Sequence, residues 1–271
     1  MNYNELKYKI DENNFNFKKK FGQNFIIDEN IINSIISKSG IDKDTLVIEI
    51  GPGAGALTKK LVLDAGFVLC YEIDTSLKPF LDEINSSNLE VVYEDFLKAN
   101  VNEKIKDFSF DKIFVIANLP YYITTPIILK FIEDKIPITK LIVMVQKEVG
   151  DRFKASPNSK DYNSLSIFLN YYFSIRKIMD VSRNVFLPKP NVDSIVVEFE
   201  RKKCQYYVKN EDLFFKLVRD SFKQKRKTIK NNLSDYDLYK IEEILKKHNF
   251  SLSSRAEQIP AEVFADIANN L

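Results

Sequence analysis

Four consecutive residues, Asn118 to Tyr121, combine groups that could carry out chemistry on the amino group of a planar base. The amide oxygen of Asn118 can accept a hydrogen bond from such an amine, Pro120 removes a competing backbone N–H, and the ring of Tyr121 can stack on the base. An apolar run with β-branched residues, 112–117, precedes them and predicts a buried strand. Taken alone, the tetrapeptide is better explained as an ordinary strand exit, so its interpretation as an active site depends on the rest of the chain.

A glycine-rich turn, 51–56, follows another predicted strand. Three of the 7 glycines of the chain fall between Gly51 and Gly55. Glycine allows a tight turn and lets the backbone approach a ligand at the N-terminus of the following helix. With Ala56 in the last place, the turn also satisfies the dinucleotide fingerprint. It therefore indicates a nucleotide-like ligand without identifying it, and a plain tight turn is the alternative.

Carboxylates follow the next two predicted strands. Glu72 lies about 20 residues after Gly51, where an acidic residue often binds ribose hydroxyls, and Asp74 is the nearby alternative. Asp95 could accept a hydrogen bond from an adenine amino group. Each carboxylate alone is equally consistent with a solvated turn, but together with the glycine-rich turn they indicate a site for an adenosine.

Nicotinamide cofactors and S-adenosylmethionine (SAM) both contain adenosine, and the segment 118–121 distinguishes between them. Hydride transfer has no evident use for these residues. An exocyclic amine is a poor nucleophile until its hydrogens are held out of the ring plane, and acceptors from Asn118 and the Leu119 carbonyl could hold them there. Methyl transfer then needs no strong general base, which suits a chain whose only histidine is His248.

Short apolar runs alternate with helical segments from residue 45 onward, which predicts an α/β fold with a doubly wound parallel sheet. A helix with Asp28 as its N-cap and Gly40 at its end is expected before them. The alternating run 193–199 is expected to pair antiparallel at an edge of the sheet. The expected strands are 46–50, 68–73, 89–93, 113–117 and 141–145, and the expected helices between them are 57–63, 76–84 and 126–132.

The two ends of the chain differ from this pattern. Residues 1–17 show no sustained period and are expected to form a poorly ordered arm. From about residue 205 a small all-helical domain is expected, because apolar residues recur at helical spacing between Phe214 and Ile229. A basic cluster is predicted on the opposite face of that helix, where it could bind nucleic-acid phosphates or merely be solvated. It consists of Lys223, Lys225, Arg226, Lys227 and Lys230.

The composition narrows the class of protein. The chain has 271 residues, 45% of them apolar, and a net charge of +2, which are globular values. Residues 1–20 are polar and basic and no run is long enough for a membrane span, so a cytoplasmic protein is expected. Cys70 and Cys204 lack metal-ligand spacing and are expected to be unpaired thiols, and a single histidine argues against a zinc site. Nothing demands a partner chain, so we expect a monomer.

From about residue 18 onward the chain resembles the small-subunit ribosomal RNA adenine dimethyltransferases of the KsgA type. The glycine-rich stretch 49–55 is shared by many methyltransferases, whereas 186–194 is specific to this family. The resemblance implies a Rossmann-like SAM-dependent methyltransferase domain over 18–204 and a helical RNA-docking domain over 205–271. The other matching stretches are 21–25, 57–58, 118–121, 223–228, 231–233 and 255–257.

The resemblance also implies an activity and a set of site residues. Two methyl groups would be transferred to N6 of each of two adjacent adenosines near the 3′ end of the small-subunit rRNA, within an immature 30S particle. Tyr121 and Phe186 would sandwich the extruded base, and Asn118, Leu119 and Pro120 would complete the catalytic loop. The implied cofactor contacts are Asn24, Ile26, Gly51, Gly53, Glu72, Asp95 and Asn118, and the implied RNA contacts are Lys223, Lys225, Arg226 and Lys227.

The chain departs from the family pattern in two places. The stretch 157–163 carries asparagine where relatives usually have glycine. Lysines also replace several arginines of the basic cluster, and a lysine lacks the bidentate fork of the arginine guanidinium.

Three alternatives remain. An antibiotic-resistance (Erm-type) methyltransferase of large-subunit rRNA is disfavoured by 186–194, and a DNA adenine methyltransferase by Leu119, where proline is usual. The third is a ribosome-assembly factor whose binding role exceeds its catalysis.

Overall fold

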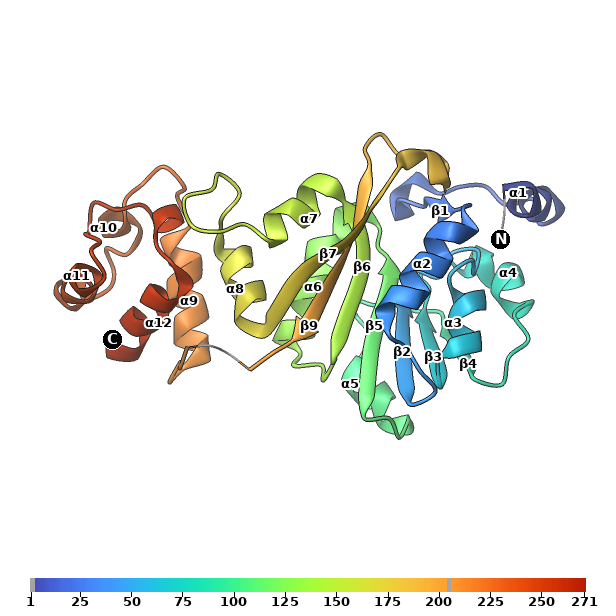
Figure 1. Cartoon of the computed structure of the whole chain (residues 1–271), viewed down its shortest axis with the longest axis horizontal. Helices are drawn as coiled ribbons and strands as arrows, with labels where there is room; N and C mark the ends of the chain where they lie inside the picture. The colour runs from blue at the N-terminus through green and yellow to red at the C-terminus, as the bar shows by residue number, and fades with distance from the viewer. Residues whose placement is uncertain (1–2, 204–205) are drawn as a thin grey trace. The chain divides into compact units, whose positions relative to one another are not determined.

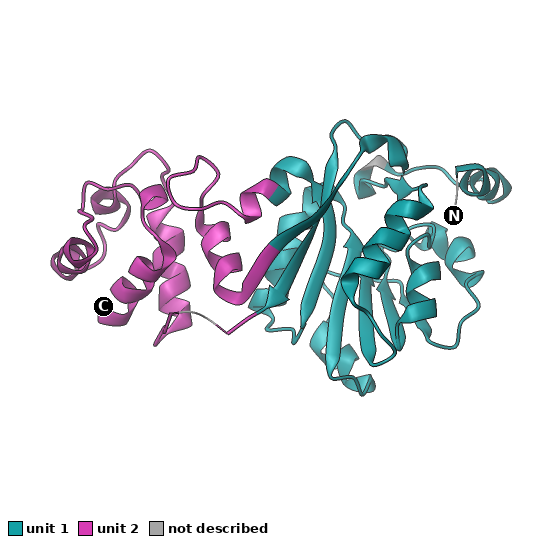
Figure 2. Cartoon of the chain, in the orientation of Figure 1, with its two compact units in different colours: residues 1–150, 176–201 teal, residues 151–175, 202–271 magenta. Residues whose placement is uncertain are grey.

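The computed structural model describes residues 3–203 and 206–271, and the chain divides into two compact units (Figure 2). The first unit comprises residues 1–150 and 176–201, and the second comprises residues 151–175 and 202–271. The segment 151–175 thus belongs to the second unit, although it was expected in the first. The expected boundary at 204/205 and the thiol of Cys204 lie outside the described residues.

A seven-stranded sheet forms the centre of the first unit, in the order β4-β3-β2-β5-β6-β9-β7 (Figure 1). The strands from β4 to β6 pair in parallel, and β9 pairs antiparallel to β6. A separate antiparallel pair consists of β1 (Phe25–Ile26) and β8 (Phe186–Leu187). The strands of the sheet are β2 (Thr45–Ile50), β3 (Phe67–Tyr71), β4 (Leu89–Val92), β5 (Lys112–Asn118), β6 (Lys140–Gln146), β7 (Phe173–Val181) and β9 (Ser194–Arg201).

Helices cover both faces of this sheet, which confirms the predicted doubly wound architecture. In Figure 1, α2 (Glu29–Ser39) and α3 (Thr58–Asp64) lie in front of the sheet and α6 (Thr124–Glu133) lies behind it. All six residues of β2 are buried, as expected of a strand covered on both faces. The remaining α-helices near the sheet are α4 (Lys78–Asp82), α5 (Val101–Lys104) and α7 (Lys147–Phe153).

Helix α2 begins and ends where the sequence predicts. The side chain of Asp28 accepts a hydrogen bond from the Asn30 N–H across 2.8 Å, which satisfies one of the free donors of the first turn. Gly40 ends the helix with φ 71°, a left-handed conformation that glycine adopts without steric cost. The buried residues Ile32, Ile35 and Ile36 fix this helix in the core in front of the sheet.

Strand β9 pairs antiparallel as predicted, but its expected place at the edge is wrong. Strand β7 lies outside β9 and forms the edge. Only Phe173 and Val181, at the two ends of β7, are buried, and the residues between them are exposed or half-buried. An edge strand with such a surface carries no apolar run, which is why the sequence pattern did not reveal it.

The N-terminal segment is helical where a poorly ordered arm was expected. Helix α1 spans Tyr3–Glu12, and Leu6 is fully buried. After the helix, the ring of Phe15 packs 5.5 Å from the ring of Phe80 and 5.9 Å from that of Phe25. Isolated apolar side chains thus anchor the segment without the sustained period that a sequence pattern needs.

From residue 206 onward the second unit is helical, as predicted. Its core contains the fully buried side chains of Phe214, Leu217 and Phe264. No helix in the described part of the chain is long and apolar enough to cross a membrane. The helices are α8 (Ser164–Tyr172), α9 (Glu211–Ser221), α10 (Ile229–Asn232), α11 (Leu238–Lys247) and α12 (Ala261–Asn270).

The basic cluster lies in the turn after α9 and at the start of α10, so its prediction on the face of one long helix is wrong. The Asn232 side chain donates to the carbonyls of Ser221 and Gln224, across 2.7 and 3.2 Å, and accepts from the Gln224 N–H across 3.2 Å. These bonds satisfy backbone groups that a continuing helix would use. All five basic side chains of the cluster are exposed.

Asn158, in the stretch 157–163, adopts φ 70°. This is the left-handed conformation that glycine favours and that asparagine tolerates better than most residues. Its N–H donates to the Glu257 carbonyl across 2.8 Å. The asparagine therefore holds this turn in a conformation that glycine also adopts readily.

Candidate active site

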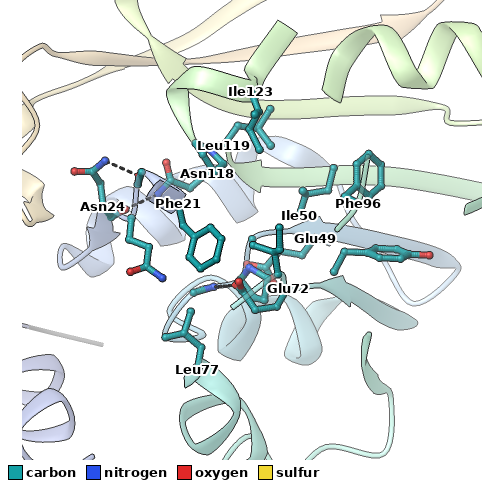
Figure 3. A pocket seen from close by; sticks show the side chains of 18 of the residues that line it. Phe21, Asn24, Glu49, Ile50, Glu72, Leu77, Phe96, Asn118, Leu119 and Ile123 are labelled. Atoms are coloured by element: carbon teal, nitrogen blue, oxygen red, sulfur yellow. Dashed lines mark hydrogen bonds between the residues drawn. The ribbon is translucent and has the colours of Figure 1, made fainter. Parts of the chain in front are cut away.

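A cavity of about 230 Å³ opens where β2, β3, β4 and β5 end, the usual ligand position in an open α/β sheet. The segment 21–26 closes another side of it. Side chains from these separate segments, among them Phe21, Glu72 and Asn118, face the same space (Figure 3). The lining includes every predicted cofactor contact and the catalytic loop: Asn24, Ile26, Gly51, Gly53, Glu72, Asp95, Asn118, Leu119, Pro120 and Tyr121.

The glycine-rich turn brings main chain rather than side chains to the cavity. Gly51, Gly53 and Gly55 all have positive φ, between 59° and 77°. A Cβ at position 53 would lie 2.8 Å from the Phe25 ring, and one at position 55 would lie 2.6 Å from the Ile84 side chain. The positive φ therefore favours glycine at all three positions, and at position 53 a Cβ would also require the Phe25 ring to shift.

Glu72, at the end of β3, is a buried carboxylate beside this turn. Its Oε2 accepts from the Gly53 N–H across 3.1 Å, and its Oε1 accepts from the Asp74 N–H across 2.8 Å. Burial raises the pKa of Glu72 to about 6, although these two hydrogen bonds lower it. Each oxygen keeps acceptor capacity for a further donor from a ligand in the cavity.

Asp74, the alternative to Glu72 in the sequence interpretation, anchors the segment 18–23. Its carboxylate accepts from Lys18 Nζ across 2.5 Å, from Gln23 Nε2 across 2.7 Å and from Ser76 Oγ across 2.6 Å. Burial raises the pKa of Asp74, but these donors outweigh that effect and lower it. Because Asp74 has these partners, Glu72 is the better-placed acceptor for a ligand.

Asn118 ends β5 with its side chain in a defined orientation. Its Nδ2 donates to the Asn24 carbonyl across 2.8 Å, and the Asn24 Nδ2 donates to the Gly22 carbonyl across 2.9 Å. An amide nitrogen held by a carbonyl leaves its oxygen available as an acceptor. The next residue, Leu119, is fixed by a bond from its N–H to the Met144 carbonyl on β6, across 3.2 Å.

Tyr121 lines the cavity, whereas Phe186, its predicted stacking partner, does not. The Tyr121 hydroxyl lies 2.8 Å from Ser194 Oγ at the start of β9, which fixes its ring. Phe186 is 3% exposed, belongs to the core and pairs with Ile26 across the β1–β8 pair. Its ring would have to move to reach a base in the cavity.

Sequence reasoning missed two contributors to the site. Glu49, 1% exposed, lines the cavity and accepts from Thr58 Oγ1 across 2.7 Å, and burial raises its pKa to about 7. An acidic residue within an apolar strand was the available signal. Ser194 fixes Tyr121 from about 70 residues away in the chain, and no local pattern reveals such a contact.

Neither a metal-ligand group nor the basic cluster is found at the cavity among the described residues. They contain no group of three histidine, cysteine or carboxylate side chains that could hold a metal ion. The four basic residues expected to bind RNA, Lys223, Lys225, Arg226 and Lys227, belong to the second unit and do not line the cavity.

A glycine-rich turn, a carboxylate at the end of the neighbouring strand and an Asn-Leu-Pro-Tyr loop, on a doubly wound sheet, define a Rossmann-like methyltransferase. The chain belongs to the ribosomal RNA adenine dimethylase family, whose model matches residues 14–271. It is an rRNA adenine methyltransferase of this family, as the resemblance predicted.

Individual relatives agree with this assignment. The chain is 45% identical to the ribosomal RNA small subunit methyltransferase A of Oceanobacillus iheyensis, over 94% of this chain and 90% of that one. It is 51% identical to the protein of the same name from Staphylococcus aureus, over 84% and 78% of the two chains. Among solved structures, it is similar to a dimethyladenosine transferase from Plasmodium falciparum, with a TM-score of 0.73 and 25% identity over 90% and 95% of the two chains. The 23S rRNA methyltransferase ErmE has the same fold, with a TM-score of 0.69 and 24% identity over 91% and 99%.

Proposed function

We propose that this protein uses SAM to dimethylate N6 of two adjacent adenosines near the 3′ end of the small-subunit rRNA, in an immature 30S particle in the cytoplasm. The names of its relatives support a small-subunit rRNA substrate. The observation that carries the chemistry is the orientation of Asn118, whose Nδ2 is held by the Asn24 carbonyl so that its oxygen can accept from a substrate amine. The protein is proposed to act as a monomer.

The cavity offers groups that could bind the adenosine and methionine parts of SAM. The main chain of the turn at Gly51 and Gly53 allows close approach of a ligand, and a Cβ at Gly51 would meet no atom within 4 Å. Glu72 can accept from the two ribose hydroxyls, since a carboxylate oxygen that accepts from a backbone N–H, as each of its oxygens does, keeps a further lone pair for a ligand. Asp95 lies in the cavity wall, and its Oδ1 accepts from the Leu97 N–H across 3.0 Å. The other lone pairs of this carboxylate can accept a hydrogen bond from the adenine amine. Asn24 and Ile26 line the cavity beside Asn118.

The proposed mechanism relies on positioning rather than on a strong base. SAM, when bound, supplies an electrophilic methyl group. Asn118 Oδ1 and the Leu119 carbonyl accept hydrogen bonds from the target amine, hold its hydrogens out of the ring plane and stabilise the positive charge that develops on nitrogen. After each transfer the cationic nitrogen loses one proton to solvent water. The same acceptors then serve the N–H that remains after the first transfer, so two methyl groups can be added in turn.

The target base must leave its stack to reach this cavity. Tyr121, whose hydroxyl is tied to Ser194, offers a fixed ring on which the base can stack. Phe186 is proposed as the second ring of the sandwich. Because its ring is buried in the core, the β1–β8 pair must move before the ring can reach the base. We propose that the exposed basic cluster of the second unit binds the RNA backbone.

The test is methyl transfer from labelled SAM to purified immature small ribosomal subunits. Large subunits serve as the comparison. The proposal predicts label in the small-subunit RNA, whereas label confined to large-subunit RNA would support the Erm-type alternative. Particle binding without any transfer would support the assembly-factor alternative.

A further inference from the structure

A second tyrosine at the cavity mouth, Tyr122, has no role in the chemistry described above. It lines the cavity, yet it is 58% exposed, which makes it one of the most exposed large apolar residues of the described chain. Its neighbour Tyr121 is half-buried and bonded to Ser194. Both belong to a short 3₁₀ segment, Tyr121–Ile123, in which successive side chains point in different directions. The two rings therefore present separate surfaces.

One side of the Tyr122 ring rests on the main chain. A Cβ at Gly22 would lie 3.3 Å from the ring atoms Cδ1 and Cε1 of Tyr122, and 3.7 Å from Pro120 Cβ. Gly22 has φ 59°, so this position is restricted both by conformation and by the ring. The Tyr122 ring thus packs against Gly22 while more than half of the residue faces solvent, as a ring on which a base stacks must.

Positive charge lies on the same segment as Gly22. Lys20 is exposed, and its Nζ lies 4.6 Å from the centre of the Phe21 ring. Phe21 itself lines the cavity. Exposed aromatic rings combined with lysines are what unpaired nucleic-acid strands require, because bases stack on the rings and phosphates pair with the cations.

We propose that Tyr122 is a second base platform, which stacks the unpaired nucleotide next to the target adenosine while that adenosine occupies the cavity. This inference rests on the proposed rRNA function and adds a residue that positions the RNA strand. Extruding the target base removes a stacking partner from its neighbour, and the Tyr122 ring replaces that partner. In this proposal the exposed Lys20, two residues before Gly22, neutralises a phosphate of the same strand.

The test compares Tyr122→Leu with Tyr122→Phe. Leucine keeps an apolar contact with Gly22 but has no aromatic plane, whereas phenylalanine keeps the plane. At saturating SAM, Tyr122→Leu is expected to lower kcat/KM for immature small subunits about 10-fold or more, and Tyr122→Phe to stay near wild type. The SAM dissociation constant, measured by calorimetry, is expected to be unchanged in both. Tyr239→Leu, at a 72% exposed tyrosine of the second unit, is the matched control and is expected to behave as wild type.

Three outcomes would overturn the proposal. The first is full activity of Tyr122→Leu, and the second is an equal loss of activity in Tyr122→Phe. The third is a weaker SAM affinity that accounts for the whole loss of activity, because the ring would then only hold the segment around Gly22. If the wild type transfers no methyl group to small subunits, the proposed function fails instead. In that case, sedimentation with the particles still tests the role of Tyr122. Weaker binding by Tyr122→Leu but not by Tyr122→Phe supports the platform, and equal binding by both variants contradicts it.

Discussion

The side-chain nitrogen of Asn118 donates a hydrogen bond to the backbone carbonyl of Asn24, 94 residues earlier in the chain and 2.8 Å away. This bond connects the end of β5 to the segment that closes the cavity, and it decides which end of the amide faces a substrate. A carbonyl can only accept, so the nitrogen must point to Asn24 and the oxygen is left for an amine. Acceptor geometry that is fixed before the substrate arrives requires no reorganisation during the reaction.

Replacing Asn118 by alanine is expected to lower methyl transfer by about 10²- to 10³-fold or more, the usual effect of removing one preorganised hydrogen-bonding group. Binding of immature small subunits should stay largely intact, because the basic cluster lies elsewhere in the chain. The measurements are transfer of labelled methyl groups and sedimentation with the particles. Asn102→Ala is the matched control, since its amide also donates to a backbone carbonyl, that of Asp134, away from the cavity. Near-normal transfer by Asn118→Ala would refute the assigned role.

The bond between Tyr121 and Ser194 predicts a non-additive pair. Tyr121→Phe keeps the ring but leaves the fully buried Ser194 hydroxyl without its partner, so the free energy of unfolding should fall by about 1–2 kcal/mol. Adding Ser194→Ala should restore part of that loss. Denaturant unfolding of the two single variants and the double variant measures the coupling. Additive losses would show that the two hydroxyls do not depend on each other.

Methyl transfer separates the ring of Tyr121 from its hydroxyl. Tyr121→Phe retains the stacking surface and should remain active, whereas Tyr121→Ala should lose about 10-fold or more. Comparable activity of the phenylalanine and alanine variants would count against the ring as a base platform.

SAM affinity is expected to depend on pH through Glu72. Its pKa of about 6 means that the carboxylate is protonated as the pH falls below that value, and a protonated carboxyl loses acceptor capacity for ribose hydroxyls. The dissociation constant should therefore be constant well above pH 6 and rise toward tenfold per pH unit below it. Calorimetric titration with SAM from pH 5 to pH 8 measures this dependence.

Two variants identify the titrating group. Glu72→Gln should bind SAM more weakly and show little pH dependence in this range. Glu49, which also lines the cavity and has a pKa of about 7, could titrate in the same range. In Glu49→Gln the affinity for SAM should still fall below pH 6. If the affinity of that variant no longer depended on pH, Glu49 rather than Glu72 would be the titrating group.

Salt dependence tests the basic cluster. Replacing Lys223, Lys225 and Arg226 by glutamine should lower the slope of log affinity against log salt concentration by about one for each RNA phosphate that the variant no longer neutralises. The same number of exposed lysines on α11, at positions 240, 246 and 247, provides a control with an equal change in charge. An unchanged slope in the first variant would show that the cluster is only solvated.

The sequence predicted the parts of the fold that local patterns encode. The parallel strands from β2 to β6 and the caps of α2 are visible because buried runs and capping residues are contiguous in the chain. It failed where tertiary contacts decide. The Asn232 side chain ends α9 early, and the helix α1 depends on isolated buried side chains such as Leu6.

The same division applies to the site. Glycines, strand-end carboxylates and the loop at Asn118 could be found because each follows a predicted strand. The bond from Ser194 to Tyr121 and the anchoring of Gln23 by Asp74 could not be found, since they join segments that only the folded chain brings together. The burial of Phe186 in the core also depends on the β1–β8 pair, which is only two residues long in each strand.

The most direct test of the proposed function is mass analysis of nucleosides and RNA fragments from immature small subunits incubated with the protein and SAM. We predict N6,N6-dimethyladenosine at two adjacent positions near the 3′ end of the small-subunit rRNA. Monomethylated adenosine as the only final product, or dimethyladenosine found only in large-subunit RNA, would contradict it.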